Sequence, residues 1–154
     1  METQIIKIKI TFLEPMLGTI PKNKDLYSDF IIDKNAKDVD NGMREEELKT
    51  VQDLDEKLSR GWTGFHSDEK GLFIYNYMIK GFLKNAGNIL KDQLKIKALK
   101  SKLTNFVFVY PRKIYFNLRE PSGVLERPLR AETAQGPRVT LTKSDMINEG
   151  ATLE

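Results

Sequence analysis

Apolar and polar side chains alternate through residues 4–12, and this period of two constrains the fold more than any other pattern in the chain. Alternation of this kind is typical of a strand with one buried face, because successive side chains of a strand point to opposite sides. Pro15, Gly18 and Pro21 follow closely and predict a loop directly after this strand. The buried face is predicted to hold Ile6, Ile8, Ile10 and Phe12.

Residues 13–60 are predicted to form an excursion inserted after the first strand, and they hold most of the acidic charge. A short helix is expected over residues 25–32, with Leu26 and Phe30 facing inward. A longer acidic helix is expected over residues 44–59, because apolar residues recur there at helical spacing. Its apolar stripe consists of Leu48, Val51, Leu54 and Leu58.

Residues 76–102 predict two helices, the second beginning near Lys91 and carrying a basic face. Gly81 and Gly87 lower the intrinsic stability of the first helix by roughly 1 kcal/mol each relative to alanine. We therefore expect these two glycines to mark close packing against the sheet. The inward stripe of the first helix is expected to hold Tyr77, Ile79, Leu83, Ala86 and Leu90.

The remaining patterns predict strands. Residues 106–110 are apolar on both faces and are therefore expected to form a central strand. The order of strand, insertion, helices and further strands predicts the α+β class, with an antiparallel sheet packed by helices. The length suits one domain, covering residues 1–154. Residues 150–154 resemble the start of another strand, so a native end and a truncation at Glu154 both stay open. The other predicted strands cover residues 61–66, 71–75, 113–117, 124–130 and 139–142.

The amino-acid composition limits which kinds of site and which cellular compartment are expected for the protein. The chain has no cysteine and one histidine, which removes disulfides, thiolate nucleophiles and classical structural zinc sites from consideration. No apolar run approaches the roughly 18 residues that span a bilayer, and the N-terminus has no signal-peptide pattern. We therefore expect a cytosolic protein that does not contact membranes.

Basic and acidic residues are unevenly distributed along the chain. The net charge of +3 divides into −4 for residues 1–77 and +7 for residues 78–154. Residues 78–143 alone carry +10, from 14 basic and 4 acidic side chains. Such a division predicts a basic face and an acidic face, as in proteins that bind nucleic acid or an acidic protein. The alternative is two solvated surfaces of uneven composition.

Three arginines lie close together in a stretch that otherwise has the pattern of strands. The guanidinium group offers five donors in a planar fork that suits phosphate and carboxylate. If Leu125, Arg127 and Leu129 share a face, Arg127 either pairs with a carboxylate among core leucines or projects toward a ligand. Arg138, Thr140 and Thr142 alternate and so share one face of the predicted strand. This face either offers a row of donors to phosphates or sugars, or is an ordinary solvated strand face.

Basic residues outside this stretch could widen it into a groove. Lys80 and Lys84 lie one helical turn apart, and Arg112 and Lys113 follow the expected central strand. A groove that binds single strands needs aromatic platforms, for which Trp62, Tyr75, Tyr110 and Tyr115 are candidates, although at least two of the four are expected in the core. The predicted binding residues are Lys80, Lys84, Arg112, Lys113, Tyr115, Arg127, Arg130, Arg138 and Lys143.

The sequence favours binding over catalysis. His66 stands beside Ser67 and Asp68, but triad residues are rarely adjacent in sequence, so we expect a histidine in a turn. Phosphate-binding glycine loops and nucleophile-elbow motifs are absent from the sequence. We expect no catalytic residues, no cofactor and no metal. The acidic residues Glu45, Glu46, Glu47, Asp53, Asp55 and Glu56 are expected on solvated or protein-binding faces.

Four stretches of the chain carry resemblances to two known families. Residues 79–86, with Lys80-Gly81 and Lys84, are similar to the helix motif that follows the first strand in RAMP-superfamily proteins. Residues 109–112, the block 127–139 and residues 17–19 resemble uncharacterised early proteins of phages and prophages of Gram-positive bacteria. The first resemblance implies a ferredoxin-like fold related to the subunits that line guide RNA in CRISPR effector complexes. The second implies a phage protein acting in the host bacterial cytosol.

These inferences lead to two main functional hypotheses. The first is a phage-encoded, non-enzymatic protein that binds DNA or RNA through a basic sheet and helix surface. The second is an anti-defence protein, such as a CRISPR inhibitor, that binds a host nuclease or a ribonucleoprotein effector complex. In that case either the arginines or an acidic helix over residues 44–59 would make the contact. Sequestration of a small molecule and assembly into a homo-oligomer also stay open.

Overall fold

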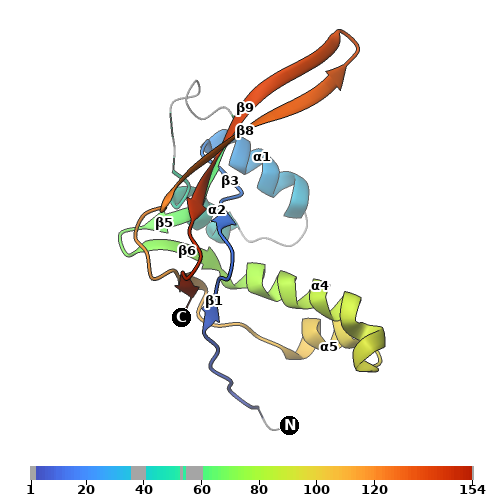
Figure 1. Cartoon of the computed structure of the whole chain (residues 1–154). Coiled ribbons are helices and arrows are strands. Elements are labelled where there is room, and N and C mark those ends of the chain that lie inside the picture. The colour runs from blue at the N-terminus through green and yellow to red at the C-terminus, as the bar shows by residue number, and fades with distance from the viewer. Residues whose placement is uncertain (1–2, 36–40, 53, 55–60, 154) are drawn as a thin grey trace. The chain divides into compact units, whose positions relative to one another are not determined.

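The computed structural model describes residues 3–35, 41–52, 54 and 61–153, with side chains described outside residues 30–44 (Figure 1). The chain is an α+β protein, with antiparallel and mixed sheets and four helices in the described part, as the order of sequence patterns predicts. It divides into two compact units, residues 1–72 with 116–154, and residues 73–115. Within the described residues, no helix combines the length and the apolar character needed to cross a membrane.

The first unit is built around one long strand, β9. Strand β9 pairs antiparallel with β8 along its length, and near its end it pairs parallel with β4 and antiparallel with β2. Strand β3 pairs with the other edge of β4, and β1 pairs with β10. The strands of this unit are β1 (Ile10–Thr11), β2 (Met16–Leu17), β3 (Ile20–Pro21), β4 (Trp62–Gly64), β5 (His66–Asp68), β8 (Gly123–Thr133), β9 (Gly136–Ile147) and β10 (Thr152–Leu153).

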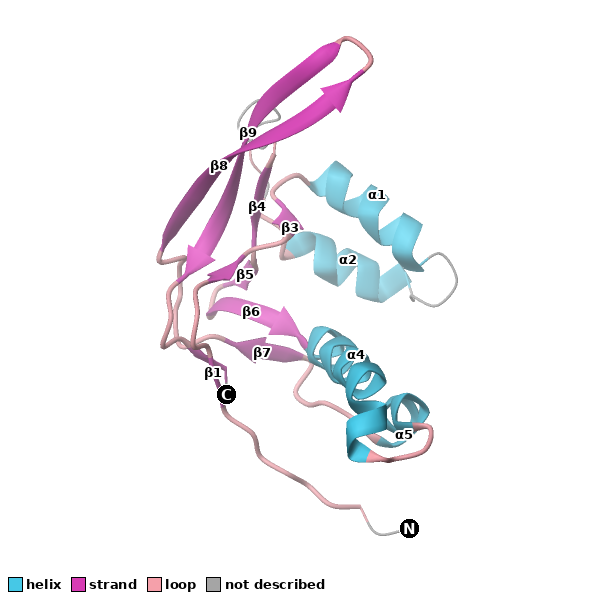
Figure 2. Cartoon of the chain, turned by 45° about the vertical axis from the view of Figure 1, so that its right-hand side comes forward, coloured by secondary structure: helices cyan, strands magenta, loops and turns pink. Residues whose placement is uncertain are grey.

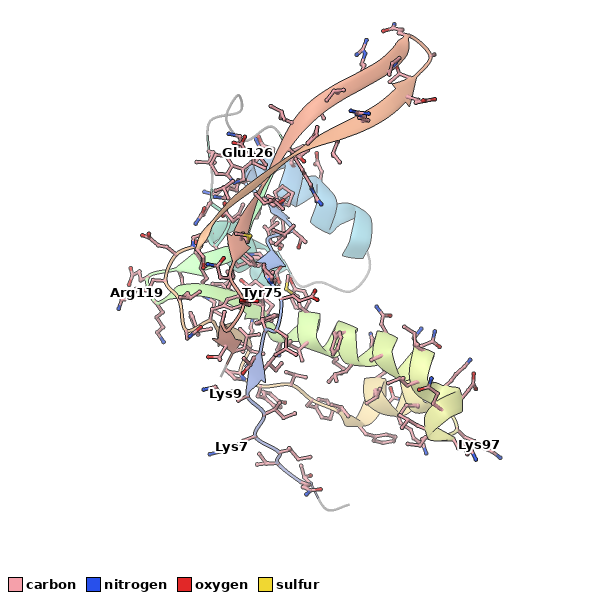
Figure 3. The ribbon with its side chains drawn as sticks, viewed as in Figure 1. Lys7, Lys9, Tyr75, Lys97, Arg119 and Glu126 are labelled. Carbon is pink, nitrogen blue, oxygen red and sulfur yellow. The ribbon has the colours of Figure 1, made fainter. Side chains whose placement is uncertain are left out.

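The first predicted strand is much shorter than its alternation indicates. Only Ile10–Thr11 is a strand, and it pairs with Leu153 and Thr152 of β10. Residues 3–9 lie outside any strand, and Ile5, Ile6 and Ile8 are 87%, 69% and 71% exposed. Lys7 and Lys9 project from this segment in Figure 3. The prediction was wrong over residues 4–9, because alternation produces a strand only where a second strand supplies the hydrogen bonds.

Two helices follow β3 in the first unit, α1 (Lys24–Asn35) and α2 (Asn41–Lys49). Helix α1 begins where the side chain of Asn23 accepts a hydrogen bond from the amide of Leu26 at 2.9 Å, which is the pattern of an N-cap. The expectation that Leu26 faces inward was wrong, since Leu26 is exposed and Tyr27 is buried instead. The side chain of Phe30 lies outside the described part.

Helix α2 ends earlier than the acidic helix predicted for residues 44–59. The amide of Thr50 donates to the carbonyl of Glu47 at 3.1 Å, which tightens the last turn. The hydroxyl of Thr50 donates to the same carbonyl at 2.7 Å, so the side chain competes for the helical acceptor. Val51 is buried but lies beyond the helix. Residues 53 and 55–59 of the predicted helix lie outside the described residues.

The core of the first unit is largely aromatic and aliphatic. The ring of Phe116 lies 5.7 Å from that of Phe65 and 5.8 Å from that of Phe12, which attaches the end of β1 to the core. An isolated bridge also joins Phe116 to Leu153. The buried apolar residues of this unit are Ile20, Tyr27, Val51, Phe65, Leu72, Phe116, Ile147, Ala151 and Leu153.

The second unit combines one strand pair with two helices (Figure 2). Strand β6 (Gly71–Tyr75), most of which falls in this unit, pairs antiparallel with β7 (Lys113–Tyr115). Helix α4 (Asn76–Leu94) starts directly after β6, as predicted, and α5 (Leu99–Phe106) follows it. Lys95 and Ala98 adopt left-handed backbone conformations, with φ of 54° and 56°, and these separate the two helices.

The two glycines of α4 differ in their surroundings. A Cβ atom on Gly87 would lie 2.4 Å from Cδ1 of Leu103 and 3.3 Å from Cγ of Leu99, both on α5. Nothing lies within 4 Å of a Cβ on Gly81. The expectation that both glycines pack against the sheet was wrong. Gly87 permits close helix–helix contact, and Gly81 has open space beside it.

Residues 106–110 do not form the predicted central strand. Phe106 ends α5, and residues 107–110 connect it to the segment that leads into β7. Phe106, Phe108 and Tyr110 are 62%, 66% and 80% exposed. The prediction was wrong because an apolar run describes a buried strand and an exposed aromatic segment equally well.

Candidate nucleic-acid interface

Helix α4 displays a polar and basic stripe along one face. At 3.6 residues per turn, positions 77, 80, 84, 88 and 91 fall within one narrow sector of the helix. Tyr77 stands at the start of this stripe and Lys91 near its end. The two lysines predicted from the sequence as binding residues, Lys80 and Lys84, lie between them on successive turns. The helix therefore places both lysines on the same face.

An aromatic hollow lies at the start of this stripe. The ammonium of Lys80 lies 5.2 Å from the centre of the Phe108 ring, within the range of a cation–π contact. The side-chain amide of Asn76 donates to the carbonyl of Val109 at 2.8 Å and holds the segment 107–110 against the helix. The hollow has a volume of about 220 Å³ and is lined by Asn76, Tyr77, Lys80, Phe108, Val109 and Tyr110.

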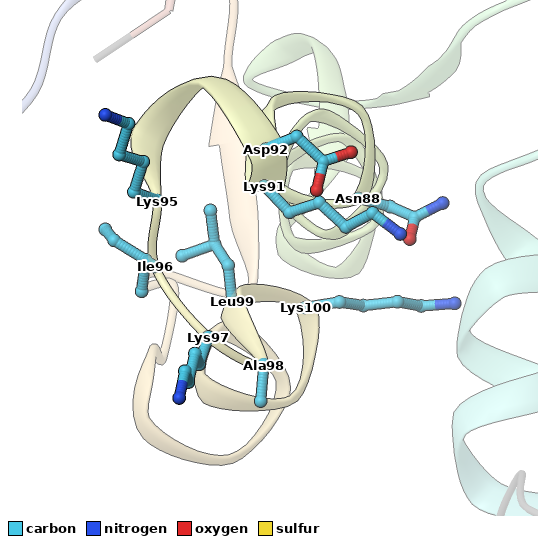
Figure 4. A pocket seen from close by; sticks show the side chains of 9 residues that line it. All are labelled: Asn88, Lys91, Asp92, Lys95, Ile96, Lys97, Ala98, Leu99 and Lys100. Atoms are coloured by element: carbon cyan, nitrogen blue, oxygen red, sulfur yellow. The ribbon is translucent and has the colours of Figure 1, made fainter.

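A lysine hollow lies at the other end of the stripe, at the turn between α4 and α5 (Figure 4). It has a volume of about 530 Å³, and Asp92 is the only acidic residue of its lining. Figure 4 shows the side chains of Lys91 and Lys100 extending to the same side of the turn. The lining residues are Asn88, Lys91, Asp92, Lys95, Ile96, Lys97, Ala98, Leu99 and Lys100.

The whole second unit is strongly basic. Residues 73–115, all of which are described, hold nine lysines and arginines and one acidic residue, Asp92, which gives a net charge of +8. The sequence pattern located this charge in a longer and less distinct stretch, residues 78–143. The structure concentrates most of it on one helix pair and the strand that follows.

Three predicted binding residues of this unit pack on buried aromatic rings. The guanidinium of Arg112 lies 5.0 Å from the ring centre of Tyr75, and the ammonium of Lys113 lies 4.9 Å from that of Phe73. The ring of Tyr115 lies 5.4 Å from that of Phe73. Phe73 and Tyr75 are both fully buried. Arg112, Lys113 and Tyr115 therefore cover the β6–β7 pair, while Lys80 and Lys84 belong to the α4 stripe.

The aromatic residues predicted as stacking platforms also divide into buried and exposed ones. Tyr75 is buried and unavailable for stacking, whereas Tyr110 is 80% exposed. Phe106 and Phe108 were missed as exposed aromatics, because the apolar run 106–110 was assigned to the core. The available signal was the position of these aromatics inside a strongly basic segment.

The other four predicted residues lie on the β8–β9 hairpin, whose distal part extends beyond the other strands of its sheet (Figures 1 and 2). Residues directly opposite each other in an antiparallel pair share a face. Arg127 opposes Thr142 and Arg138 opposes Ala131, and both pairs lie on one face together with Thr140. Arg130 lies on the other face, opposite Val139. The hairpin thus distributes its three arginines over two faces.

The expectation that core leucines flank Arg127 was wrong. Leu125 and Leu129 share its face and are both exposed. On this part of the hairpin no further layer of the first unit, as far as it is described, covers the strands, so their alternation does not mark a buried side. The exposed guanidinium group of Arg127 faces solvent and not a core.

Prolines occupy positions of the hairpin where they cost no ladder hydrogen bond. The amide of Lys143 donates to Gly61 at 2.9 Å, and the carbonyl of Asp145 accepts from Gly18 at 2.8 Å, so odd-numbered residues of β9 direct their backbone groups away from β8. Pro137 is one of these odd-numbered residues of β9. Pro128 of β8 is opposite Leu141, another of them, so its backbone groups also point away from the partner strand. Each proline therefore removes a donor from an outer edge of the hairpin.

Lys143 belongs to a polar cluster at the base of the hairpin. Its ammonium contacts a carboxylate oxygen of Glu126 at 2.6 Å and lies 5.5 Å from the ring centre of Trp62. Glu126 marks the base of the hairpin in Figure 3. Next to it, Lys22 and Asp145 form a buried ion pair that sequence reasoning missed, because the two residues are far apart in the chain. Lys143 is therefore partly engaged within the protein.

The expectation that His66 lies in a turn was wrong. His66 is on strand β5 and is buried, with its Nε2 3.3 Å from the hydroxyl of Tyr27 on α1 and its Nδ1 3.0 Å from that of Thr50. The Thr50 hydroxyl already donates to a carbonyl, which leaves Nδ1 of His66 as the donor. The hydroxyl of Tyr27 donates its one hydrogen to a carboxylate oxygen of Glu47 at 3.2 Å. His66 thus connects α1 and the residue after α2 to strand β5.

The acidic residues do not gather into a site in the described part. Glu47 is buried and accepts from Tyr27, so it is not on the solvated face expected for it. Asp53, Asp55 and Glu56 lie outside the described residues. Among the residues that are described, no three histidine, aspartate or glutamate side chains converge as a metal site would require.

Each unit thus has its own candidate surface: residues 73–115 have a basic helix face with a hollow at each end, and the first unit has a hairpin with arginines on both faces. Comparison with known proteins found no relative of this chain. No protein-family model, no curated protein and no solved structure matches the chain.

Proposed function

We propose that this protein binds nucleic acid and does so without catalysing a reaction on it. The observation that carries the proposal is the net charge of +8 on the 43 residues of the second unit, where one acidic residue accompanies nine basic ones. Clustered lysines and arginines are the electrostatic footprint of proteins that bind the phosphate backbone.

The placement of the charges supports this proposal. Lys80, Lys84 and Lys91 recur on one face of α4, so several phosphates can be contacted along one line. The lysine hollow at the end of the helix adds further ammonium groups to the same surface. On the hairpin, Arg127 and Arg138 share a face with Thr140, a combination of donors that suits phosphate and sugar contacts.

The test measures how binding depends on salt. Fluorescence anisotropy with single- and double-stranded DNA and RNA, at 50 and 200 mM salt, should show at least one nucleic acid whose affinity falls steeply. Four neutralised phosphates on a single strand predict a log–log slope of about −3, which is a loss of roughly 50-fold over this range. No measurable binding to any of the four nucleic acids would reject the proposal.

A matched pair of variants locates the contact. Lys80→Gln with Lys84→Gln should reduce the salt slope by about 1.4, because each lost phosphate contact contributes about 0.7 for a single strand. Lys7→Gln with Lys9→Gln removes the same charge from the exposed N-terminal segment and should leave the slope unchanged. Equal effects of the two double variants would indicate a response to net charge and not a defined interface.

The finer fold and setting are part of the proposal. A ferredoxin-like arrangement related to the RAMP superfamily is supported by the helical conformation of Lys80-Gly81 and by the antiparallel pairing of β6 with β7, although the helix follows β6 and not the first strand. The proposed setting is a phage gene product in the cytosol of a bacterial host. The resemblance of residues 109–112 and 127–139 to phage early proteins supports that setting.

A second candidate is an anti-defence protein that binds a host nuclease or effector complex. Phe82 and Ile89 favour it, because both are exposed on a face of α4 outside the basic stripe, where nucleic-acid contact does not require apolar side chains. Phe82→Asp with Ile89→Asp should then abolish capture of a partner from nuclease-treated host lysate while nucleic-acid affinity is retained. Capture that survives this change would remove the candidate.

A further inference from the structure

We infer that the ligand of residues 73–115 is a single strand, with unpaired bases stacking in the aromatic hollow and phosphates bound along the α4 stripe to the lysine hollow. This inference rests on the proposed function and adds the class of nucleic acid and its direction along the helix. The two hollows at opposite ends of one basic stripe are the juxtaposition from which it is drawn.

The aromatic hollow has the properties of a stacking platform. Phe108 and Tyr110 are strongly exposed, and Tyr77 remains 44% exposed while its ring stacks on the buried Tyr75 at 5.4 Å. Bases in a duplex are already stacked on one another, so only unpaired bases can place a π face on such rings. Lys80 lies beside Phe108 and supplies a cation next to the stacking surface.

The lysine hollow has the properties of a phosphate site and lacks those of a base site. Its lining contains four lysines and no aromatic side chain. The lysines lie at the turn where α4 ends and α5 begins, and the side chains of Lys91 and Lys100 extend to the same side of it. Asp92 is the one group in the lining that would repel a phosphate.

The distance between the hollows sets the length of the ligand. Lys91 lies fourteen positions after Tyr77, which at 1.5 Å per residue corresponds to about 21 Å along the helix. A path of this length fits the short end of the roughly 4–16 nucleotide footprints of single-strand-binding domains. We therefore expect a footprint of about four to six nucleotides.

The closing experiment separates stacking from charge. Anisotropy is measured at 50 mM salt with fluorescein-labelled dT12, rU12, an abasic 12-mer that keeps the phosphates but has no bases, and a 12-base-pair duplex. The single strands dT12 or rU12 should bind about tenfold or more tighter than the abasic strand, because each stacked base adds to affinity. Comparing dT12 with rU12 then shows which sugar the site accepts.

Variants assign the two functions to the two hollows. Phe108→Ala with Tyr110→Ala should lower the affinity for the 12-mer with bases to that of the abasic strand, while Tyr110→Phe should retain it. Lys91→Ala with Lys100→Ala should weaken the strands with and without bases equally. Asp92→Asn should strengthen both by a few fold, since it removes a repulsive charge. All of these side chains are exposed, so unchanged thermal unfolding verifies that the fold is intact.

The outcomes distinguish the inference from the proposal on which it rests. Equal affinity for abasic and base-containing strands, or tighter binding of the duplex than of either single strand, would overturn the inference and leave nucleic-acid binding standing. Absence of binding to every oligonucleotide would instead reject the proposed function itself.

Discussion

Lys22 and Asp145 form an ion pair of 2.7 Å at the base of the β8–β9 hairpin, with side chains only 9% and 2% exposed. The other carboxylate oxygen of Asp145 accepts a hydrogen bond from the indole of Trp62 at 2.8 Å, and the ammonium of Lys22 lies 4.5 Å from the centre of the same ring. Residues from β9, β4 and the segment after β3 therefore meet in one charged cluster. This cluster fixes the β8–β9 hairpin to the rest of the sheet at the point where the hairpin begins to extend beyond the other strands.

Removing one partner of this pair should be costly. Asp145→Ala leaves the ammonium of Lys22 buried without its carboxylate, and the loss of unfolding free energy should be about 3–5 kcal/mol. Urea denaturation followed by circular dichroism measures it. The double variant Lys22→Met with Asp145→Leu should recover a large part of this loss, since it removes both charges. A single variant as stable as the natural chain would contradict the burial of the pair.

Two glycine substitutions should have opposite effects. A Cβ on Gly18 would lie 2.4 Å from the backbone carbon of Gly64, so Gly18→Ala forces two backbone segments apart and should cost about 1–3 kcal/mol. Gly81→Ala has open space beside it on α4 and should stabilise the protein by up to about 1 kcal/mol. Thermal unfolding of the two variants measures both effects. A loss of stability in Gly81→Ala would show that this side of the helix is covered.

The N-terminal isoleucines should contribute little to stability. Ile6→Thr with Ile8→Thr changes two exposed side chains, so the free energy of unfolding should stay within about 0.5 kcal/mol of the natural value. Phe12→Ala, four residues beyond Ile8, removes a ring that packs on Phe116 and should cost more than about 1 kcal/mol. A large effect of the isoleucine variant would indicate that residues 3–9 pack on the protein in solution.

These results show which parts of the fold could be predicted from sequence. Helix α4 and parts of strands β8 and β9, residues 124–130 and 139–142, were predicted because helical spacing and strand alternation are local patterns. The tight turn that joins the two strands was not predicted. The strand predictions for residues 4–9 and 106–110 were wrong, because a strand forms only with a partner strand from elsewhere in the chain, and a local pattern does not show one. The surroundings of His66 were equally inaccessible, since Tyr27 of α1 and Thr50, directly after α2, reach it from two separate segments.

The candidate site shows the same limit. Lys80 and Lys84 could be named from their spacing, because one helix fixes their relation. Phe108 could not, since its exposure depends on where the chain runs after α5. The arginines were assigned to one surface, whereas the register of β8 and β9 separates Arg130 from Arg127. Register is a non-local property, and a shift by a single residue would exchange the faces.

The two faces of the hairpin should respond differently to nucleic acid. Arg127→Ala with Arg138→Ala removes both guanidinium groups from the face that carries Thr140, and should reduce the salt slope of the bound nucleic acid by about 1.4. Arg130 lies on the opposite face, so Arg130→Ala should leave the salt slope of binding unchanged. Anisotropy titrations at several salt concentrations measure both. A similar response of the two faces would mean that the ligand surrounds the hairpin.

The prolines of the hairpin have a consequence for the behaviour of the protein in solution. An exposed two-stranded ribbon normally invites a strand from another molecule, because its outer edges present unpaired backbone donors and acceptors. Pro128 and Pro137 interrupt both rows of donors, one on each strand, without weakening the pairing between β8 and β9. The protein can therefore extend a long ribbon into solvent that stays available for a ligand and does not act as a seed for fibrous assembly.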